Sequence, residues 1–310
     1  GNILQGDTTL QPQVDQSGYY TLLVTDQSNG CTSESTVQIL LDQNTPEADP
    51  GDSPTLTCAI TTVPLDGTES STGPQFSYLW TTQDGQIISG DSTLTPIVGA
   101  PGTYNLLITN VNNGCVSDES VFVMEDVTPP DANAGYESVL TCANQTTDLN
   151  ITGSSTGAQY SYQWSTNNGT IDGDPNTPDP AVSNPGDYLL TVQNTLTGCS
   201  STASVNVPED VAVPAVAAAV NGELTCSVVT LPLSSAGSST GAQYDYLWTT
   251  TNGYIVSGAN TPAPVINDAG SYQLQVTNNI NGCTSTTSVA VSQNVTPPLV
   301  DATVNTLLTC

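Results

Sequence analysis

The strongest constraint on this chain is an internal repeat with a period of 84, which runs through the sequence without a gap. A fixed period of this kind means that each repeat is one structural unit, so the fold must be assigned repeat by repeat. Two cysteine motifs recur with this period: Leu-Thr-Cys, which ends at Cys58, Cys142, Cys226 and Cys310, and Gly-Cys, which ends at Cys31, Cys115, Cys199 and Cys283. Two aromatic residues recur in the same way: tryptophan at Trp80, Trp164 and Trp248, and the tyrosine of Gly-x-Tyr at Tyr20, Tyr104, Tyr188 and Tyr272. All 8 cysteines and all 3 tryptophans therefore belong to the repeat.

Within each repeat, short runs of alternating residues are separated by turn residues. The run at 76–80 puts Phe76, Tyr78 and Trp80 on one face, which is typical of a half-buried strand. Groups such as Asn-Asn-Gly at 112–114 supply the residues that tight turns need. We find no amphipathic helical segment. Roughly six or seven such strands per repeat predict an all-β fold, with one immunoglobulin-like β-sandwich for each repeat.

Prolines that recur at one position of the repeat predict the boundaries between repeats, because proline has no N–H to donate to a neighbouring strand and so ends strand pairing. They lie at Pro46, Pro130, Pro214 and Pro298. We therefore expect complete repeats at 47–130, 131–214 and 215–298, named repeats 1, 2 and 3 below. Residues 1–46 are expected to be the C-terminal part of another repeat and residues 299–310 the start of a further one, so that the sequence reads as a window on a longer polymer.

The charge is one-sided, with 29 acidic residues and no lysine, arginine or histidine. Nothing on the chain can neutralise a phosphate, so nucleic-acid binding is excluded, and no segment of this window suggests membrane insertion. An acidic surface keeps a long fibre soluble. The lack of lysine and arginine removes every trypsin-type cleavage site and predicts a protease-resistant protein.

The same absences exclude most catalytic chemistry, because histidine triads, Schiff-base lysines and histidine zinc sites cannot be built. Paired carboxylates remain, but Asp and Glu number 10 in residues 54–137, 7 in 138–221 and 4 in 222–305. A site that belonged to the repeat would keep its carboxylates. We therefore expect no enzyme activity, no catalytic residue and no required cofactor.

The cysteines predict a disulfide framework and hence an oxidising, extracellular location. A spacing of 57 within a repeat, as from Cys58 to Cys115, and a spacing of 27 across a junction, as from Cys31 to Cys58, both offer pairings. We favour the bridge within a repeat, which would contribute roughly 4 kcal/mol by chain entropy. It pairs Cys58 with Cys115, Cys142 with Cys199 and Cys226 with Cys283, and leaves Cys31 and Cys310 to partners outside the window. The alternative at the shorter spacing would pair Cys31 with Cys58 and continue so to Cys283 with Cys310.

Repeat 2 carries a family resemblance. Its motifs are Pro-Pro-Asp-Ala-Asn-Ala-Gly at 129–135, Leu-Thr-Cys at 140–142, Gly-Ser-Ser at 153–155, Tyr-Gln-Trp at 162–164, Gly-Asp-Tyr at 186–188 and Gly-Cys at 198–199. Together they resemble the PKD-like and immunoglobulin-like tandem repeats of Bacteroidota extracellular surface proteins of the gliding-adhesin type. The resemblance implies a β-sandwich, export to the cell surface or medium, and service as a stalk, adhesin or matrix fibre. The lack of basic residues departs from the pattern and counts against adhesion through a cationic patch.

Individual residues also suggest roles. We interpret Trp80, Trp164 and Trp248 as core residues, although tryptophan also stacks on sugars, and Tyr104, Tyr188 and Tyr272 as tyrosine corners. The acidic pairs Glu125-Asp126 and Glu209-Asp210, with Asp131, lie beside junctions and could ligate Ca²⁺ between repeats. The third junction has Ser292-Gln293-Asn294 instead, which weakens that hypothesis. Thr8 and Ser92 share one phase, follow an aspartate and are candidate sites of O-glycosylation.

Two classes of function remain. The first is a structural fibre or stalk whose partner is the chain itself, in a filament or in head-to-tail repeats. The second is an adhesin whose repeats bind glycans or a partner cell surface. The loop at 71–76, repeated at 155–160 and 239–244, is the one candidate for a recurring binding surface, and it also fits a turn with an inward-facing aromatic residue.

Overall fold

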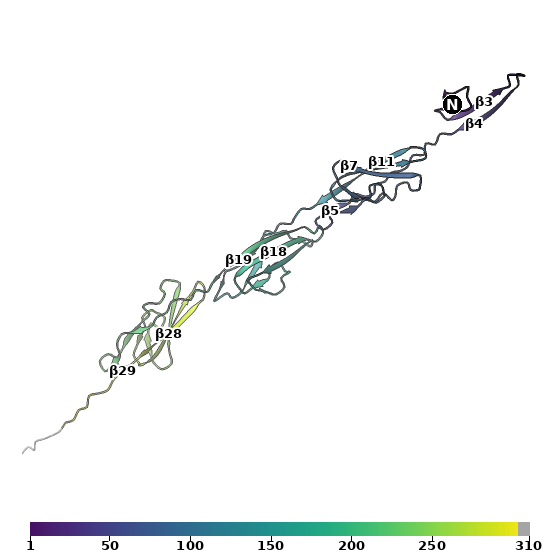
Figure 1. The fold of residues 1–310 in the computed structure, drawn as a ribbon. Helices are drawn as coiled ribbons and strands as arrows, with labels where there is room; N and C mark the ends of the chain where they lie inside the picture. Colours follow the sequence, from purple (N-terminus) through teal and green to yellow (C-terminus); the bar gives the residue numbers. More distant parts are fainter. Residues whose placement is uncertain (303–310) are drawn as a thin grey trace, which may run out of the picture. The chain divides into compact units, whose positions relative to one another are not determined.

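The computed structural model describes residues 1–302 of the 310-residue chain. Every regular element in these residues is a β-strand. The strands form separate sandwiches, with β7 and β11 in repeat 1, β18 and β19 in repeat 2, and β28 and β29 in repeat 3 (Figure 1). By its contacts the chain divides into two compact units. One is Gly1–Thr128 together with Leu196–Cys199, and the other is Pro129–Thr195 with the residues from Ser200 onward.

Repeat 1 has two sheets, with strand orders β5-β11-β10-β7 and β6-β9-β8. The strands are β5 (Thr55–Thr57), β6 (Val63–Pro64), β7 (Phe76–Thr82), β8 (Ile87–Ser89), β9 (Ile97–Val98), β10 (Gly102–Asn110) and β11 (Val116–Asp126). Strand β10 is antiparallel to both β7 and β11. The short β5 instead runs parallel to the end of β11, with Thr57 opposite Asp126. This pairing fixes the end of the sandwich at which Cys58 lies.

Repeats 2 and 3 have the same plan with two differences. Repeat 2 contains β12 (Gly135–Tyr136), β13 (Leu140–Thr141), β14 (Thr147–Asn150), β15 (Tyr160–Thr166), β16 (Ile171–Asp172), β17 (Ala181–Val182), β18 (Gly186–Asn194), β19 (Ser200–Val207) and β20 (Glu209–Asp210). Repeat 3 contains β21 (Ala219–Val220), β22 (Leu224–Thr225), β23 (Leu231–Ser234), β24 (Tyr244–Thr250), β25 (Ile255–Ser257), β26 (Val265–Ile266), β27 (Gly270–Asn278), β28 (Thr284–Val291) and β29 (Gln293–Asn294). The last strand is divided in two, and a short first strand, β12 or β21, is added to the second sheet beside β14 or β23. In repeat 2 the break falls at Pro208, which has no N–H for the ladder.

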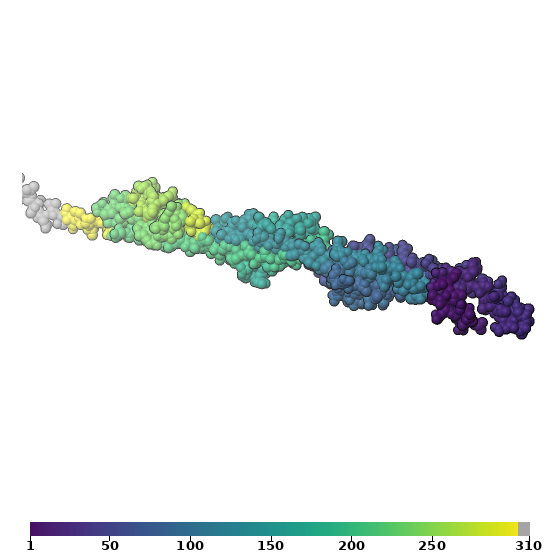
Figure 2. Space-filling model, turned by 90° about the horizontal axis from the view of Figure 1, so that it is seen from above, coloured from purple at the N-terminus to yellow at the C-terminus, as the bar shows by residue number. Residues whose placement is uncertain are grey.

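Residues 1–46 form two strand pairs, β1 (Ile3–Gln5) with β2 (Gln13–Val14) and β3 (Gly18–Thr25) with β4 (Thr32–Ile39). The β3–β4 pair has the register of β10–β11, but its apolar face is open. Leu22 and Val37 are 46% and 58% exposed, whereas Leu106 and Val121 at the same phase are 0% and 4% exposed. Beyond repeat 3, residues 299–302 contain no strand and are drawn in yellow in Figure 2, and Leu299 and Val300 among them are almost fully exposed.

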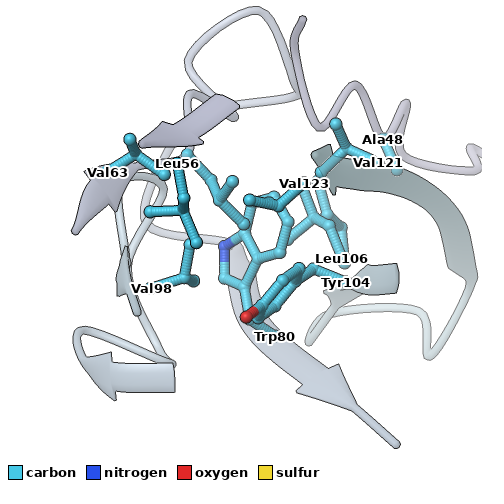
Figure 3. Packing of buried hydrophobic residues seen from close by; sticks show 11 residues of the cluster. Ala48, Leu56, Val63, Trp80, Val98, Tyr104, Leu106, Val121 and Val123 are labelled. Atoms are coloured by element: carbon cyan, nitrogen blue, oxygen red, sulfur yellow. The ribbon is translucent and has the colours of Figure 1, made fainter. Parts of the chain in front are cut away.

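Each complete repeat has its own core around a tryptophan. Trp80, Trp164 and Trp248 are 2%, 2% and 1% exposed. In repeat 1 the ring of Trp80 on β7 lies among Val98 of the second sheet and Leu106 and Val123 of its own sheet (Figure 3). These contacts hold the two sheets together, because each sheet removes its apolar face from water only against the other.

A buried tyrosine closes one end of each sandwich. The hydroxyl of Tyr188 donates to the carbonyl of Asn184 at 2.6 Å and accepts from the N–H of Thr170 at 3.1 Å. Tyr104 and Tyr272 make the same pair of bonds in repeats 1 and 3. A bond to a carbonyl four residues upstream is the geometry of a tyrosine corner, a device that fixes the crossing between sheets.

Candidate functional site: the joint between repeats

The two cysteines of each repeat lie at opposite ends of its sandwich. Cys58 follows Thr57, which is opposite the last residue of β11, whereas Cys115 directly precedes the first residue of β11. This strand has 11 residues, so its ends are about 33 Å apart at roughly 3.3 Å per residue. A disulfide requires Cα atoms within about 7 Å. The expected bridge between Cys58 and Cys115 is therefore wrong, and so are its equivalents, Cys142 with Cys199 and Cys226 with Cys283.

The disulfides instead connect consecutive repeats. Cys58 of repeat 1 is bonded to Cys199 of repeat 2, and Cys142 of repeat 2 to Cys283 of repeat 3. Both pairs are separated by 141 residues, and their Cα atoms are 5.0 and 5.1 Å apart. This separation is one full period plus the spacing between the two cysteines of a repeat. The alternative that pairs Cys31 with Cys58, and so on along the chain, is wrong for the four bonded cysteines as well.

Two loops meet at each joint, and we name them by sequence. The Leu-Thr-Cys loop lies near the start of a repeat in sequence and beside the end of its last strand in space, at 56–59 and 140–143 in the two formed joints. The Gly-Cys loop comes from the following repeat, at 197–199 and 281–283. The N–H of Ala59 donates to the carbonyl of Thr197 at 3.0 Å, and the N–H of Ala143 donates to the carbonyl of Asn281 at 3.1 Å. Each disulfide is therefore accompanied by a backbone hydrogen bond across the same joint.

A glycine makes this close approach possible. Gly198 and Gly282 have φ of +75° and +72°, where residues with a side chain are strained. A Cβ on Gly198 would lie 2.5 Å from the Cβ of Ala59, and one on Gly282 would lie 2.6 Å from that of Ala143. Both the backbone conformation and the small facing residue are thus required for contact.

Asn281 adds a side-chain connection to the second joint. It is fully buried, and its Nδ2 donates to the carboxylate of Asp210 and to the carbonyl of Ala212, both at 3.0 Å. Its Oδ1 accepts from the N–H of Cys283, which holds the loop in shape. The same position is Thr197 at the first joint, where a hydroxyl is too short to reach the preceding linker. Sequence reasoning missed this asparagine, although Asn-Gly-Cys recurs at three of the four Gly-Cys positions.

Three of the described cysteines are unpaired. Cys31 and Cys226 are exposed, and Cys115 is half-buried. Of the bonded cysteines, Cys58 and Cys142 are exposed as well, and Cys199 and Cys283 are each 1% exposed. The expectation that Cys115 and Cys226 are bonded within their repeats is wrong, because their equivalents bond to neighbouring repeats. Cys310 lies outside the described residues.

The acidic residues beside the junctions are not gathered into a cluster. Within residues 1–302 there is no group of three or more carboxylate, thiol or imidazole side chains that could hold a metal ion. Asp210 instead accepts the amide of Asn281, and Asp126 accepts the N–H of Thr128. Glu125 and Glu209 are opposite Leu56 and Leu140 in the parallel strand pairs, and Asp131 begins repeat 2 with its N–H bonded to Ser155. Calcium at the junctions stays a prediction.

Thr8 and Ser92 lie exposed in equivalent tight turns. In each turn the following threonine holds the backbone: Thr9 and Thr93 bond the carbonyls of Gly6 and Gly90 at 2.8 Å. The hydroxyls of Thr8 and Ser92 thus lie on the surface, where a glycan would meet no obstacle from the turn. Their glycosylation stays a prediction.

Comparisons with known proteins give a likeness in fold. The N-terminal eight Ig domains of Down Syndrome Cell Adhesion Molecule share 12% identity with a TM-score of 0.34, over 91% of this chain and 40% of that one. Three N-terminal domains of the Hoc outer capsid protein of bacteriophage RB49 share 15%, with a TM-score of 0.32, over 82% of this chain and 99% of that one. The PKD domain of the KIAA 1837 protein shares 23%, with a TM-score of 0.23, over 29% of this chain and 97% of that domain.

The chain thus spans well under half the length of the Down Syndrome Cell Adhesion Molecule fragment. No protein-family profile and no curated protein matches the sequence. The fold is nonetheless clear from the strand pairing of the chain itself: tandem immunoglobulin-like β-sandwiches with no helix in the described residues. Accordingly, residues 1–302 include no helix with the length and hydrophobicity of a membrane span.

Proposed function

We propose that this chain is a structural segment of an extracellular fibre or stalk, in which each immunoglobulin-like repeat is locked to the next by a disulfide joint. The observation that carries this proposal is the pairing of the cysteines. Bonds within a repeat would only stabilise that repeat. Bonds from Cys58 to Cys199 and from Cys142 to Cys283 restrict motion between repeats, and that restriction is useful in a load-bearing or spacing element.

Chemistry supports an extracellular location. Disulfides persist in oxidising compartments, and here the cysteines are placed with the period of the repeat. The chain also lacks lysine and arginine, so trypsin-type proteases find no cleavage site in it. Both properties suit a fibre outside the cell, on a surface or in the medium.

The surfaces of the repeats favour a structural spacer over an adhesin that binds glycans. Shallow hollows of about 460 and 470 Å³ recur at one phase in repeats 2 and 3, but their lining changes. Gln163 of the first hollow is replaced by Leu247 in the second, and Thr191 by Gln275. A repeat that binds one glycan would keep its polar groups.

The recurring loop at 71–76 and its equivalents also has a structural role. The hydroxyls of Tyr78 and Tyr162 donate to the carbonyls of Ser71 and Ser155 at 3.2 and 3.1 Å. Phe76 and Tyr160 are partly buried against the cores of their repeats. The loop therefore uses its aromatic residues inward, as a turn does.

Small-angle X-ray scattering of the oxidised chain tests the proposal. The variant carries Cys142→Ser and Cys283→Ser, and the matched control carries Cys115→Ser and Cys226→Ser, which removes two unpaired cysteines. We expect the control to scatter like the parent chain and the variant to show the broader distance distribution of freely hinged repeats. Circular dichroism verifies that all three proteins are folded.

Equal scattering from all three proteins would contradict the proposal, because the joint would then not restrict motion. A glycan array provides the opposing test. Specific binding that strengthens with the number of repeats would favour the adhesin.

A further inference from the structure

Several asparagines of this chain directly precede a glycine: Asn29, Asn113, Asn168, Asn221, Asn252 and Asn281. Such a pair can react without an enzyme, because the backbone nitrogen of the glycine can attack the side-chain amide carbon of the asparagine. Glycine favours the attack, since it has no Cβ in the way and its backbone reaches the required geometry easily. The sites differ in the hydrogen bonds that hold these two groups.

At five of the six sites the N–H of the glycine is already bonded. In Gly30, Gly114 and Gly282 it donates to the backbone carbonyl four residues upstream, each at 2.7 Å. In Gly169 and Gly253 it donates to a threonine hydroxyl three residues upstream, each at 3.0 Å. The nitrogen can attack only after this hydrogen bond is broken, which raises the barrier to the reaction.

The same five asparagines have their side chains fixed as well. In Asn29, Asn113 and Asn281, Oδ1 accepts the N–H of the cysteine two residues on, at 2.9 to 3.0 Å. In Asn168 and Asn252, Oδ1 accepts an N–H of the strand β18 or β27, both at 2.9 Å. The amide carbon therefore cannot turn toward the glycine nitrogen without the loss of a second hydrogen bond.

The pair Asn221-Gly222 has neither bond. It lies exposed between β21 and β22, and within residues 1–302 neither the N–H of Gly222 nor the side-chain amide of Asn221 has a hydrogen-bond partner. Exposure does not separate this pair from the others, because Asn168 and Asn252 are exposed too. Only the missing hydrogen bonds distinguish Asn221.

One difference between the repeats explains the unbonded N–H. In repeat 2 the N–H of Ser138, which has the position of Gly222, donates to the hydroxyl of Thr147 at 3.0 Å. The position of Thr147 is taken in repeat 3 by Leu231, whose side chain has no acceptor. A Cβ on Gly222 would lie 3.8 Å from Cδ2 of Leu231. Gly222 therefore has a methyl group nearby, at a position that supplies a hydroxyl in repeat 2.

We propose that Asn221 is a site of spontaneous deamidation, and that the folded chain is modified there ahead of its other Asn-Gly pairs. The nitrogen of Gly222 bonds to Cγ of Asn221 and gives up its proton, the bond from Cγ to Nδ2 breaks, and ammonia leaves. A cyclic succinimide remains. Water opens it at one of its two carbonyls and yields aspartate or isoaspartate, so water is the only co-reactant.

The modification changes the turn that leads into β22. Both products add a negative charge, and isoaspartate also adds one carbon atom to the main chain. Leu224 follows two residues later; it is buried, and its N–H donates to the carbonyl of Ser292 at 3.1 Å. The lengthened backbone thus directly precedes the β22–β29 strand pair. Because the reaction depends on time alone, it would mark old chains, and it needs nothing from the proposed fibre.

The test incubates the folded, oxidised chain in H₂¹⁸O at mildly alkaline pH. Samples are then unfolded in acid and digested with chymotrypsin in ordinary water, since trypsin has no site. Mass spectrometry counts only carboxylates that carry ¹⁸O, which formed during the incubation. We expect Asn221 to react roughly tenfold or more faster than each of the other five asparagines. In the reduced chain unfolded in guanidinium chloride, all six should react at similar rates.

Leu231→Thr and Leu231→Val are a matched pair, because threonine and valine have nearly the same shape and both shorten a core side chain. Only Leu231→Thr supplies the acceptor of repeat 2. It should slow the reaction of Asn221 roughly 2- to 10-fold relative to Leu231→Val, with Asn168 as the internal standard.

Another Asn-Gly pair that reacts as fast as Asn221 in the folded parent chain would overturn the proposal. Equal rates at Asn221 in the two Leu231 variants, both shown by circular dichroism to be folded, would overturn the role of the missing hydrogen bond. The comparison of the six sites in the parent chain decides the proposal even where a variant does not fold.

Discussion

Gly282 of repeat 3 lies so close to Ala143 of repeat 2 that a Cβ on the glycine would be 2.6 Å from the Cβ of the alanine. Gly114 has nearly the same backbone, with φ of +76° against +72°, but a Cβ on it would meet nothing within 4 Å. Comparing alanine substitutions at the two glycines therefore separates the effect of positive φ from the effect of contact across the joint.

Substitution of Gly282 by alanine should weaken the joint more than substitution of Gly114. Both variants lose roughly 1–2 kcal/mol because a side chain is placed at positive φ, and only Gly282→Ala loses a further 1–3 kcal/mol or so through overlap with Ala143. Urea denaturation of the two variants measures the difference, and alkylation of Cys283 reports the open disulfide. Equal stability of Gly282→Ala and Gly114→Ala would show that the contact is unimportant.

Removal of the Asn281 side chain should also destabilise the second joint. Asn281→Ala removes the hydrogen bonds from a buried side-chain amide to the Asp210 carboxylate and the Ala212 carbonyl. Both acceptors belong to exposed residues that water can reach, so the loss is the net contribution of the two bonds, roughly 1–3 kcal/mol together. Asn113→Ala is the control, because Asn113 makes the same bond to its cysteine but is only half-buried and bonds one linker carbonyl. Calorimetry of both variants compares the two losses, and we expect the larger for Asn281.

Two of the core tryptophans, Trp80 and Trp248, should differ in their tolerance of phenylalanine. The indole N–H of Trp80 donates to the carbonyl of Thr93 at 2.9 Å, whereas the buried N–H of Trp248 has no partner in the described part of the chain. Both substitutions remove similar volume. Trp80→Phe should therefore cost about 1 kcal/mol more than Trp248→Phe, as measured by thermal unfolding. The reverse order would mean that the bond to Thr93 contributes nothing.

Tyr188→Phe should destabilise repeat 2 by roughly 1–3 kcal/mol, because Asn184 and Thr170 lose their partner. The partly buried Tyr162 has one hydroxyl bond, to Ser155, so Tyr162→Phe is the milder control. Chemical denaturation of both proteins at neutral pH gives the comparison.

Alkaline pH offers a further check on Tyr188. Burial raises the pKa of this tyrosine above its ordinary value of 10.0, because desolvation disfavours the tyrosinate. The folded state then holds a proton that the unfolded state has lost, so stability falls as the pH rises from about 10 through the raised pKa. Tyr188→Phe should flatten this part of the pH profile. An unchanged slope would show that Tyr188 is not its source.

Much of the fold follows from the sequence because the period of the repeat is exact. Alternating residues at 76–80 and the turn residues around them predict strands and a sandwich, and β7, β15 and β24 do begin one period apart, at Phe76, Tyr160 and Tyr244. The pairing of the cysteines does not follow. It depends on whether the strand before Cys58 lies beside the start or the end of the last strand, and both arrangements have the same sequence pattern. A parallel pairing of Thr57 with Asp126 decides it.

Two features of the joint are visible in the sequence, but their structural role cannot be inferred from it. Asn-Gly-Cys reads as a simple turn, and the alanines after Cys58 and Cys142 read as ordinary surface residues. Their meaning lies in a contact between residues of different repeats, far apart in the sequence, which no local pattern encodes.

The disulfide-closed loops overlap along the chain. The loop from Cys58 to Cys199 and the loop from Cys142 to Cys283 share the residues between Cys142 and Cys199. Every peptide bond from Cys58 to Cys283 therefore lies inside at least one closed loop, including those at both proline junctions. Bonds confined to single repeats would have left the junctions outside any loop. One backbone cut anywhere in this stretch leaves a single covalent molecule, so a nicked fibre would keep its continuity until a second cut or a reductant reached the same joint.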